Sequence, residues 1–518
     1  MYGPCTARTT GTIWGIVMFP AQVRANDLVG CRYRLHQRAV HPNIPPLPES
    51  LERQPRIDAA RALVLNALPT KRAVGDGRRK LFIRVDVDPA DGDEEQAAHT
   101  IAAIRAGAHV ITNARLAGQI EGVRVVADVD VLVRDGHDYL PVIISNHRVA
   151  RAHETSRMAM IPVGRLGLSA PLEVPAKPRH HTVDGYRLAI AELLLRDYGK
   201  ATGRGGVIGQ DRTRAYIGDV ERFIPPLIEA LTAPIPAEPK RLKQCATCRF
   251  WELCRPRLEE LDDISLVLPG GRGDVLRDEG ITTVQMLIDA NVGEPSAIAR
   301  AWREDIPLLR RPGEITIPRA DVEIDIDMEA YLDQGAYLWG AFDGQRYYSF
   351  VTWDEVGGAD SAAEERNFGQ FWGWLRQRKQ AASSAGKTFR AYCFAAGGEN
   401  YWMRSSAKRF GSVDAAEVAA FLSSDEWVDV FAYARKHLVG TDGLGLKVLA
   451  PAAGFTWEDD DVDGERSIAL RRAARLGDHA ARDMLLRYNE DDCRATRAVR
   501  DFLTSGAPGV PLIDQMRD

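Results

Sequence analysis

Three cysteines, Cys245, Cys248 and Cys254, follow one another with the spacing CxxC-x5-C. Thiolates this close together suit a metal centre, which would fix the backbone around them and demand a fourth ligand from elsewhere in the chain. Cys31 is the upstream candidate, and Cys393 is a downstream one. Whichever residue supplies it, the fold must bring a distant segment to this cluster.

The chain holds seven cysteines, and an odd number argues against a disulfide framework. A structural zinc held by four cysteines, or by three cysteines and one histidine, would use a fourth ligand such as Cys393 or His437. Outside such a site, Cys5, Cys393 and Cys493 show no partner spacing, and we expect them to be free.

The 518 residues are too many for one hydrophobic core, so two to four domains are expected. The composition is that of a globular protein, with 45% hydrophobic and 27% charged residues and a net charge of -5.

The apolar stretch at residues 13–20 is too short to span a bilayer and lacks a signal-peptide pattern, which predicts a cytoplasmic protein without a membrane partner. Met18 is a candidate start. No GxxxxGK[ST] sequence occurs, so a helicase motor would be a separate protein.

The order of the local patterns predicts an α/β protein in three parts. Residues 123–134 and 139–145 are expected to form neighbouring strands joined by Asp135-Gly136, and residues 186–198 a helix. A proline-rich connector at 234–239 precedes the cysteines.

A second pattern, of alternating acids, lies at residues 321–329 (DVEIDIDME). Side chains on a strand alternate between its faces, so Asp321, Glu323, Asp325 and Asp327 do not form an ordinary core face. An apolar strand follows at 337–340. The acids indicate cation binding, and an acidic edge strand that discourages aggregation is the alternative.

Tyr488 and Asp492 lie four residues apart in a predicted helix near the C-terminus. They share one face of that helix, where a phenol and a carboxylate together could hold a metal and orient a water molecule. An exposed helix that carries this pair by coincidence is the plain alternative.

Together these acids resemble the DEDD exonucleases of the RNase H-like fold, and most closely the YprB-type domain. The resemblance assigns Asp325 and Asp327 to the first motif, with Asp327 and Glu329 as the alternative register. Glu399 stands where the third acid is expected, with Asp429 as a lower-ranked candidate, and Tyr488 with Asp492 completes the site. Lys447 is expected near the cleft.

The resemblance implies 3′→5′ hydrolysis of phosphodiester bonds with two Mg²⁺ or Mn²⁺ ions, roughly 4 Å apart. Asp325 would bridge both ions, and Asp327, Glu399 and Asp492 would complete their oxygen shells. Tyr488 would position the attacking water.

The N-terminal cysteine layout, one distant cysteine and a later CxxC-x5-C, resembles the iron–sulfur nucleases of the RecB and AddB type. This implies that Cys31, Cys245, Cys248 and Cys254 hold a [4Fe–4S] cluster, with zinc as the less favoured metal. It also implies a fold of the PD-(D/E)xK restriction-endonuclease type.

Asp128 or Asp130 fits the first acid of a PD-(D/E)xK site, but the next strand, 141–147 (PVIISNH), lacks the acid and the lysine. We therefore expect a degenerate nuclease domain that still binds nucleic acid. His147, Arg148, His180 and His181 could line the remaining cleft, although surface histidines are the simpler interpretation.

Glycines at 270–273, followed by 280–284 (GITTV), resemble a helix-hairpin-helix element that binds phosphates. Almost the whole chain resembles the bacterial RecB-like nuclease family, which implies an N-terminal iron–sulfur domain (18–255), a helical segment (256–318) and an RNase H-like domain (319–518). A role in DNA repair or recombination follows from the resemblance, with DNA favoured over RNA. A catalytically inactive nucleic-acid-binding scaffold and an exoribonuclease are the alternatives.

Overall fold

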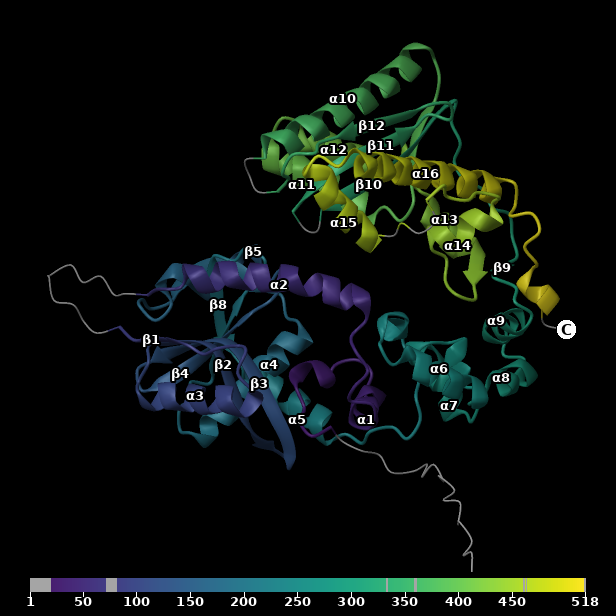
Figure 1. The fold of residues 1–518 in the computed structure, drawn as a ribbon. Coiled ribbons are helices and arrows are strands. Elements are labelled where there is room, and N and C mark those ends of the chain that lie inside the picture. Colours follow the sequence, from purple (N-terminus) through teal and green to yellow (C-terminus); the bar gives the residue numbers. More distant parts are fainter. Residues whose placement is uncertain are drawn as a thin grey trace, which may run out of the picture. The chain divides into compact units, whose positions relative to one another are not determined.

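The computed structural model describes residues 20–70, 82–331, 334–357, 361–459, 462 and 464–516. Met18 and Cys5 lie outside the described residues. The chain divides into two compact units, Met1–Ser265 and Leu266–Asp518, both of mixed α/β structure (Figure 1). No helix among the described residues is long and apolar enough to cross a membrane.

An eight-stranded sheet forms the centre of the N-terminal unit, in the order β1-β2-β3-β4-β7-β8-β5-β6. Its strands are β1 (Arg84–Asp86), β2 (Val110–Ile120), β3 (Val123–Asp135), β4 (Asp138–Ile144), β5 (Ala150–Pro162), β6 (Leu172–Pro178), β7 (Arg204–Ile208) and β8 (Arg214–Asp219). The helices of this unit are α1 (Tyr33–Val40), α2 (Pro48–Ala67), α3 (Asp93–Arg105), α4 (Thr182–Asp197), α5 (Ile224–Thr232) and α6 (Trp251–Glu260).

The predicted hairpin of the N-terminal unit is confirmed, since β3 and β4 pair antiparallel and Gly136 takes a φ of 64° in the turn. The helix predicted at 186–198 is α4. Leucines and isoleucines of α3 and α4 pack on one face of the sheet, and Val64 of α2 packs on the other together with Leu68, the residue that follows this helix. Covering both faces explains why β3 is apolar on both sides.

The C-terminal unit is built on a five-stranded sheet in the order β12-β11-β10-β13-β14, where β10, β13 and β14 are parallel and β11 and β12 antiparallel to their neighbours. Its strands are β10 (Val322–Tyr331), β11 (Gly335–Phe342), β12 (Tyr347–Val351), β13 (Phe389–Cys393) and β14 (Trp427–Asp429), with β9 (Leu308–Arg310) and β15 (Leu438–Gly440) paired separately. The helices are α7 (Asp274–Asp278), α8 (Val284–Ala290), α9 (Glu294–Arg303), α10 (Ala362–Ser384), α11 (Gly397–Phe410), α12 (Ala415–Leu422), α13 (Val430–His437), α14 (Leu446–Ala452), α15 (Gly464–Arg475) and α16 (His479–Thr504).

Strand β10 is the central strand of this sheet, and its alternation places unlike residues on its two faces. Ile324 and Ile326 join the apolar core formed with α10 and α11. Asp325 and Asp327, which alternate with these isoleucines, point to the opposite face of the sheet, where α16 packs on β10 and β11. Figure 1 shows α10 and α16 on opposite sides of this sheet.

The helical segment after the cysteines packs with the C-terminal unit. The unit boundary falls between Ser265 and Leu266, whereas the sequence suggested boundaries near 255 and 318. Contacts of α9 with β9 and with the 3-10 helix Ile513–Met516 account for this grouping. The expected glycine turn is present, with Gly270 at a φ of 72° ahead of α7.

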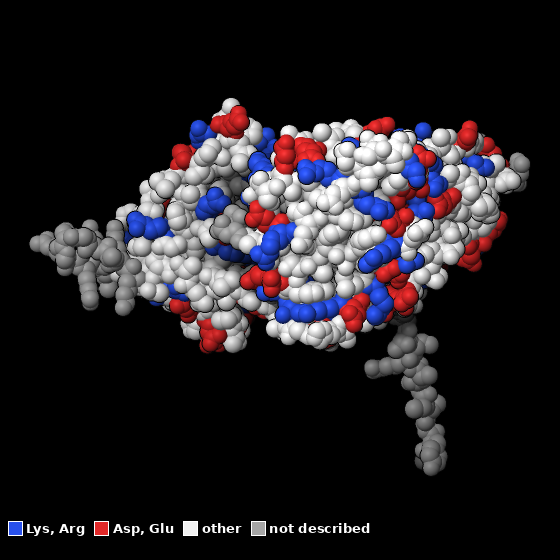
Figure 2. All heavy atoms as spheres, turned by 90° about the horizontal axis from the view of Figure 1, so that it is seen from above, with Lys and Arg blue, Asp and Glu red and all other residues white. Residues whose placement is uncertain are grey.

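The surface of the molecule carries mixed charge. Figure 2 shows Lys and Arg side chains interspersed with Asp and Glu over the face that it draws, in keeping with a net charge of only -5. Attraction of a polyanion therefore depends on local clusters rather than on the net charge.

Candidate active site

Three carboxylates meet between β10 and α16: Asp327, Glu329 and Asp492. One oxygen of each lies within 4.8 Å of the other two. Asp327 and Glu329 are two residues apart on β10 and so point to the same face, and α16 brings Asp492 to that face. The register Asp327–Glu329, left open by the sequence, is thus the one whose two side chains meet Asp492.

Helix α16 approaches the strands closely because β11 has a glycine at the crossing. Gly340 lies opposite Asp327 in the register, and a Cβ there would come within 1.7 Å of Asn489 Oδ1. Asn489 Nδ2 donates to Asp327 Oδ2 at 2.7 Å, and its Oδ1 accepts from the Tyr347 hydroxyl at 2.7 Å. Asn489 therefore orients Asp327, and neither Asn489 nor Tyr347 was singled out from the sequence.

Two side chains hydrogen-bond Asp492, and a lysine near both of them adds positive charge. Trp457 Nε1 donates to Asp492 Oδ1 at 2.8 Å, and Tyr488 hydrogen-bonds the same carboxylate. Lys447 Nζ lies 5.7 Å from the ring centres of both Tyr488 and Trp457. Burial raises the pKa of Asp492 to about 6, although these three neighbours favour its ionised form.

The group is electrostatically unfavourable without a cation. Burial, followed by the charges of Asp492 and Glu399, raises the pKa of Glu329 to about 8. Burial also raises the pKa of Asp327 well above its usual range, with Asp492 and Glu329 as the next causes. Several carboxylates that repel one another in a buried place are an arrangement that a divalent cation stabilises.

Glu399 lies beside this group, in the first turn of α11, and is 5% exposed. Its Oε2 is buried without a hydrogen-bond partner among the described residues. Burial raises the pKa of Glu399 to about 7, and its charge contributes to the raised values of Asp327 and Glu329. Asp429 has another role, because its Oδ1 caps α13 at Phe431 N, 3.0 Å away.

Asp325, by contrast, lies in an ion-pair network. Its carboxylate is fully buried and pairs with Arg500, and Arg497 Nη1 lies 3.5 Å from its second oxygen. Arg500, also fully buried, reaches Glu323 as well. The structure thus places Asp325 with two arginines and outside the group formed by Asp327, Glu329 and Asp492.

These residues fit divalent metal ions. Carboxylate oxygens are the ligands that Mg²⁺ and Mn²⁺ prefer, and three of them converge here. The unpartnered Glu399 Oε2 offers a fourth oxygen at the edge of the group.

In the N-terminal unit, the four cysteines Cys31, Cys245, Cys248 and Cys254 line one small cavity. Leu242 N donates to the Cys245 sulfur at 3.2 Å, and burial raises the pKa of Cys254 to about 12. Among the described residues, no three of the sulfurs lie within 4.8 Å of one another.

The two aspartates considered for a PD-(D/E)xK site both bind arginines. Asp128 pairs with Arg24 and accepts from Arg115 Nε at 2.9 Å. Asp130 pairs with two further arginines, Arg61 and Arg187. Guanidinium groups therefore occupy the carboxylate oxygens that a metal would need.

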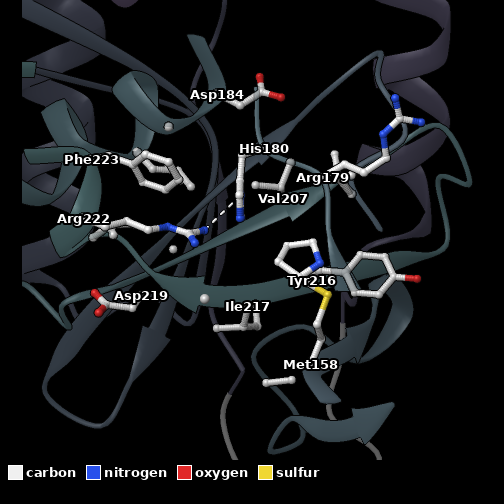
Figure 3. A pocket seen from close by; sticks show the side chains of 18 of the residues that line it. Met158, Arg179, His180, Asp184, Val207, Tyr216, Ile217, Asp219, Arg222 and Phe223 are labelled. Carbon is white, nitrogen blue, oxygen red and sulfur yellow. Dashed lines mark hydrogen bonds between the residues drawn. The ribbon is translucent and has the colours of Figure 1, made fainter. Parts of the chain in front are cut away.

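Two of the predicted cleft histidines, His180 and His181, line a cavity of about 400 Å³ at the start of α4, whereas His147 and Arg148 are not among its lining residues. Figure 3 shows His180 beside Arg222, whose Nη2 donates to His180 Nδ1 at 2.9 Å. The His147 and His181 rings stack, with centroids 4.0 Å apart. Asp128 and Asp130 do not line this cavity.

Comparison with known families agrees with the C-terminal geometry. Residues 325–504 match the family model of the RNase H superfamily, a span that contains every acid of the group described above. No curated protein matches the chain. Residues 325–504 therefore form an RNase H-like domain, which indicates a nuclease-like function in general and nucleic acid as the partner of that domain.

Proposed function

We propose that the C-terminal unit is a metal-dependent 3′→5′ exonuclease whose metal ligands are Asp327, Glu329, Glu399 and Asp492. The convergence of three carboxylate oxygens within 4.8 Å carries this proposal. Asp327 replaces Asp325 as the first acid, because Asp325 is neutralised by Arg500. When bound, two divalent ions would activate the attacking water and stabilise the leaving oxygen.

The residues around the ligands then have distinct tasks. Asn489 and Trp457 orient Asp327 and Asp492 through single hydrogen bonds. Tyr488 keeps its proton, since burial raises its pKa, and its hydroxyl can hold the attacking water next to Asp492. Lys447, close to both aromatic rings, supplies positive charge beside the phosphate that is being cleaved.

An end-labelled digestion tests this function. Single-stranded DNA and RNA with 3′ or 5′ labels are incubated with the full chain in Mg²⁺ or Mn²⁺, beside Asp492→Asn. The proposal predicts stepwise loss from the 3′ end, DNA preferred, and a loss of activity of at least about a hundredfold in the variant. Activity that survives Asp492→Asn would place the chemistry elsewhere, and binding without any hydrolysis would favour the inactive scaffold.

For the N-terminal unit we propose a degenerate PD-(D/E)xK-type domain stapled by a [4Fe–4S] cluster on Cys31, Cys245, Cys248 and Cys254. The cavity that these four cysteines share supports a common metal centre, and their CxxC-x5-C spacing with one distant cysteine favours a cluster. Anaerobically purified protein should be brown, with broad visible absorption that Cys254→Ser removes. Colourless protein with one zinc per chain would refute the cluster.

A further inference from the structure

An arginine-lined pocket lies next to the cysteine cavity in the N-terminal unit. It has a volume of about 470 Å³, within the range of roughly 300–1,000 Å³ typical of ligand sites. Cys31, Cys245 and Cys248 border both cavities. Among the described lining side chains, four are arginines and one is an aspartate: Arg24, Arg34, Arg38, Arg249 and Asp27.

Two of these arginines are already matched by acids. Arg38 pairs with Asp27, and Arg24 pairs with Asp93 and Asp128. Their charges are therefore largely compensated within the fold.

Arg34 and Arg249 have no such compensation among the described side chains. Arg34 Nη2 donates to backbone oxygens, at 3.0 Å to Val29, and its Nε is buried without a partner. The Arg249 guanidinium lies 4.7 Å from the Phe250 ring centre, and no described carboxylate pairs with it.

The remaining polar lining consists of Asn26, Ser50, Gln244 and Thr247. Arginines accompanied by short hydroxyl and amide side chains are the groups that contact the phosphates and sugars of nucleic acids. A pocket with a single strong cation and apolar walls would favour a small anion instead.

We propose that this pocket binds the phosphodiester backbone of a nucleic-acid strand, with Arg249 and Arg34 as its phosphate contacts. This assignment rests on the proposed function, which makes nucleic acid the ligand. It concerns binding by the N-terminal unit and not hydrolysis.

The test measures binding of a labelled single strand with phosphorothioate ends to the full chain, without added divalent metal, from 50 to 300 mM KCl. Arg249→Ala should weaken binding roughly tenfold at low salt and reduce the slope of log K against log salt by about 0.7, the value for one phosphate contact of a single strand. Arg249→Lys should recover part of the affinity.

Arg204→Ala is the matched control, because it removes the same charge from an exposed pair with Asp135, 45% and 48% exposed. Equal slopes for Arg249→Ala and Arg204→Ala would overturn the proposal. The binding assay contains no divalent metal and does not depend on hydrolysis, so failure of the pocket and failure of the C-terminal site are distinguishable.

Two further readouts separate other roles of Arg249. If affinity falls only in proportion to iron and visible absorption, Arg249 balances the charge of the cysteine centre and the proposal is wrong. If inorganic phosphate binds in an Arg249-dependent manner while strand affinity is unchanged, the pocket takes a free phosphate and the strand assignment fails.

Discussion

The crossing of α16 over β11 at Gly340 offers a sharp test of how the acidic site is positioned. In Gly340→Ala the new Cβ would lie 1.7 Å from Asn489 Oδ1 and 2.9 Å from Asn489 Cγ. A real Cβ does not tolerate such contacts, so the Asn489 side chain must move. It would then lose its bonds to Asp327 and Tyr347, both 2.7 Å long.

Two costs follow from this displacement. Overpacking a buried crossing costs about 1–3 kcal/mol of unfolding free energy. Loss of an outer partner of a metal ligand typically reduces metal affinity by about 10–100-fold. Gly340→Ala should therefore be less stable and should need a correspondingly higher Mn²⁺ concentration for half-maximal hydrolysis.

The assay combines chemical denaturation with Mn²⁺-dependence of the initial rate, for Gly340→Ala, Asn489→Ala and the double variant. The double variant removes the clash with Asn489 and leaves only the 3.0 Å contact with Tyr347 Cε2, so it should recover part of the stability relative to Gly340→Ala while its Mn²⁺ requirement stays raised. An unchanged Mn²⁺ requirement in all three variants would refute the positioning role of Asn489.

Three further predictions follow from the ion pairs and carboxylates. Asp325→Asn should weaken the buried pair with Arg500 yet keep metal-dependent hydrolysis, whereas Asp327→Asn should abolish that hydrolysis. An equal loss of hydrolysis in both variants would restore Asp325 as a metal ligand. Arg500→Met should lower the unfolding free energy by about 3–5 kcal/mol, because it leaves Asp325 buried without this partner, and Asp325→Asn in the same chain should recover part of it. The pKa values of Glu329, Glu399 and Asp492 are raised in the folded state, to about 8, 7 and 6, so the metal-free protein binds more protons when folded than when unfolded and should lose stability as pH rises from about 4 to 8. Mg²⁺ should therefore raise the melting temperature more at pH 8 than at pH 6. An equal rise at both pH values would contradict this sign.

Local patterns predicted much of the fold. The alternation at 321–327 and the period of the last helix correspond to β10 and α16 in the structure. Both signals are short-range, since strand alternation and helical repeat depend on neighbouring residues alone. The same holds for the β3–β4 hairpin with its Asp-Gly turn.

Local patterns do not show which acids of β10 belong to the metal site. Asp325, Asp327 and Glu329 all face the same side of β10, and only the packing of α16 decides which of them meets Asp492 and which meets Arg500. Asn489 carries no chemical signal in the sequence, and its role depends on Gly340, on a different strand. The unit boundary after Ser265 likewise depends on contacts between α9 and the C-terminal residues.

Counting bound Mn²⁺ tests the central claim most directly. Free Mn²⁺ is followed by electron paramagnetic resonance during titration of the wild type, Asp325→Asn, Asp327→Asn and Asp492→Asn. Two strongly bound ions in the wild type and in Asp325→Asn, with loss of at least one in the other two variants, is the predicted result. A wild type that binds no Mn²⁺, or an Asp492→Asn that binds as the wild type does, would contradict the account.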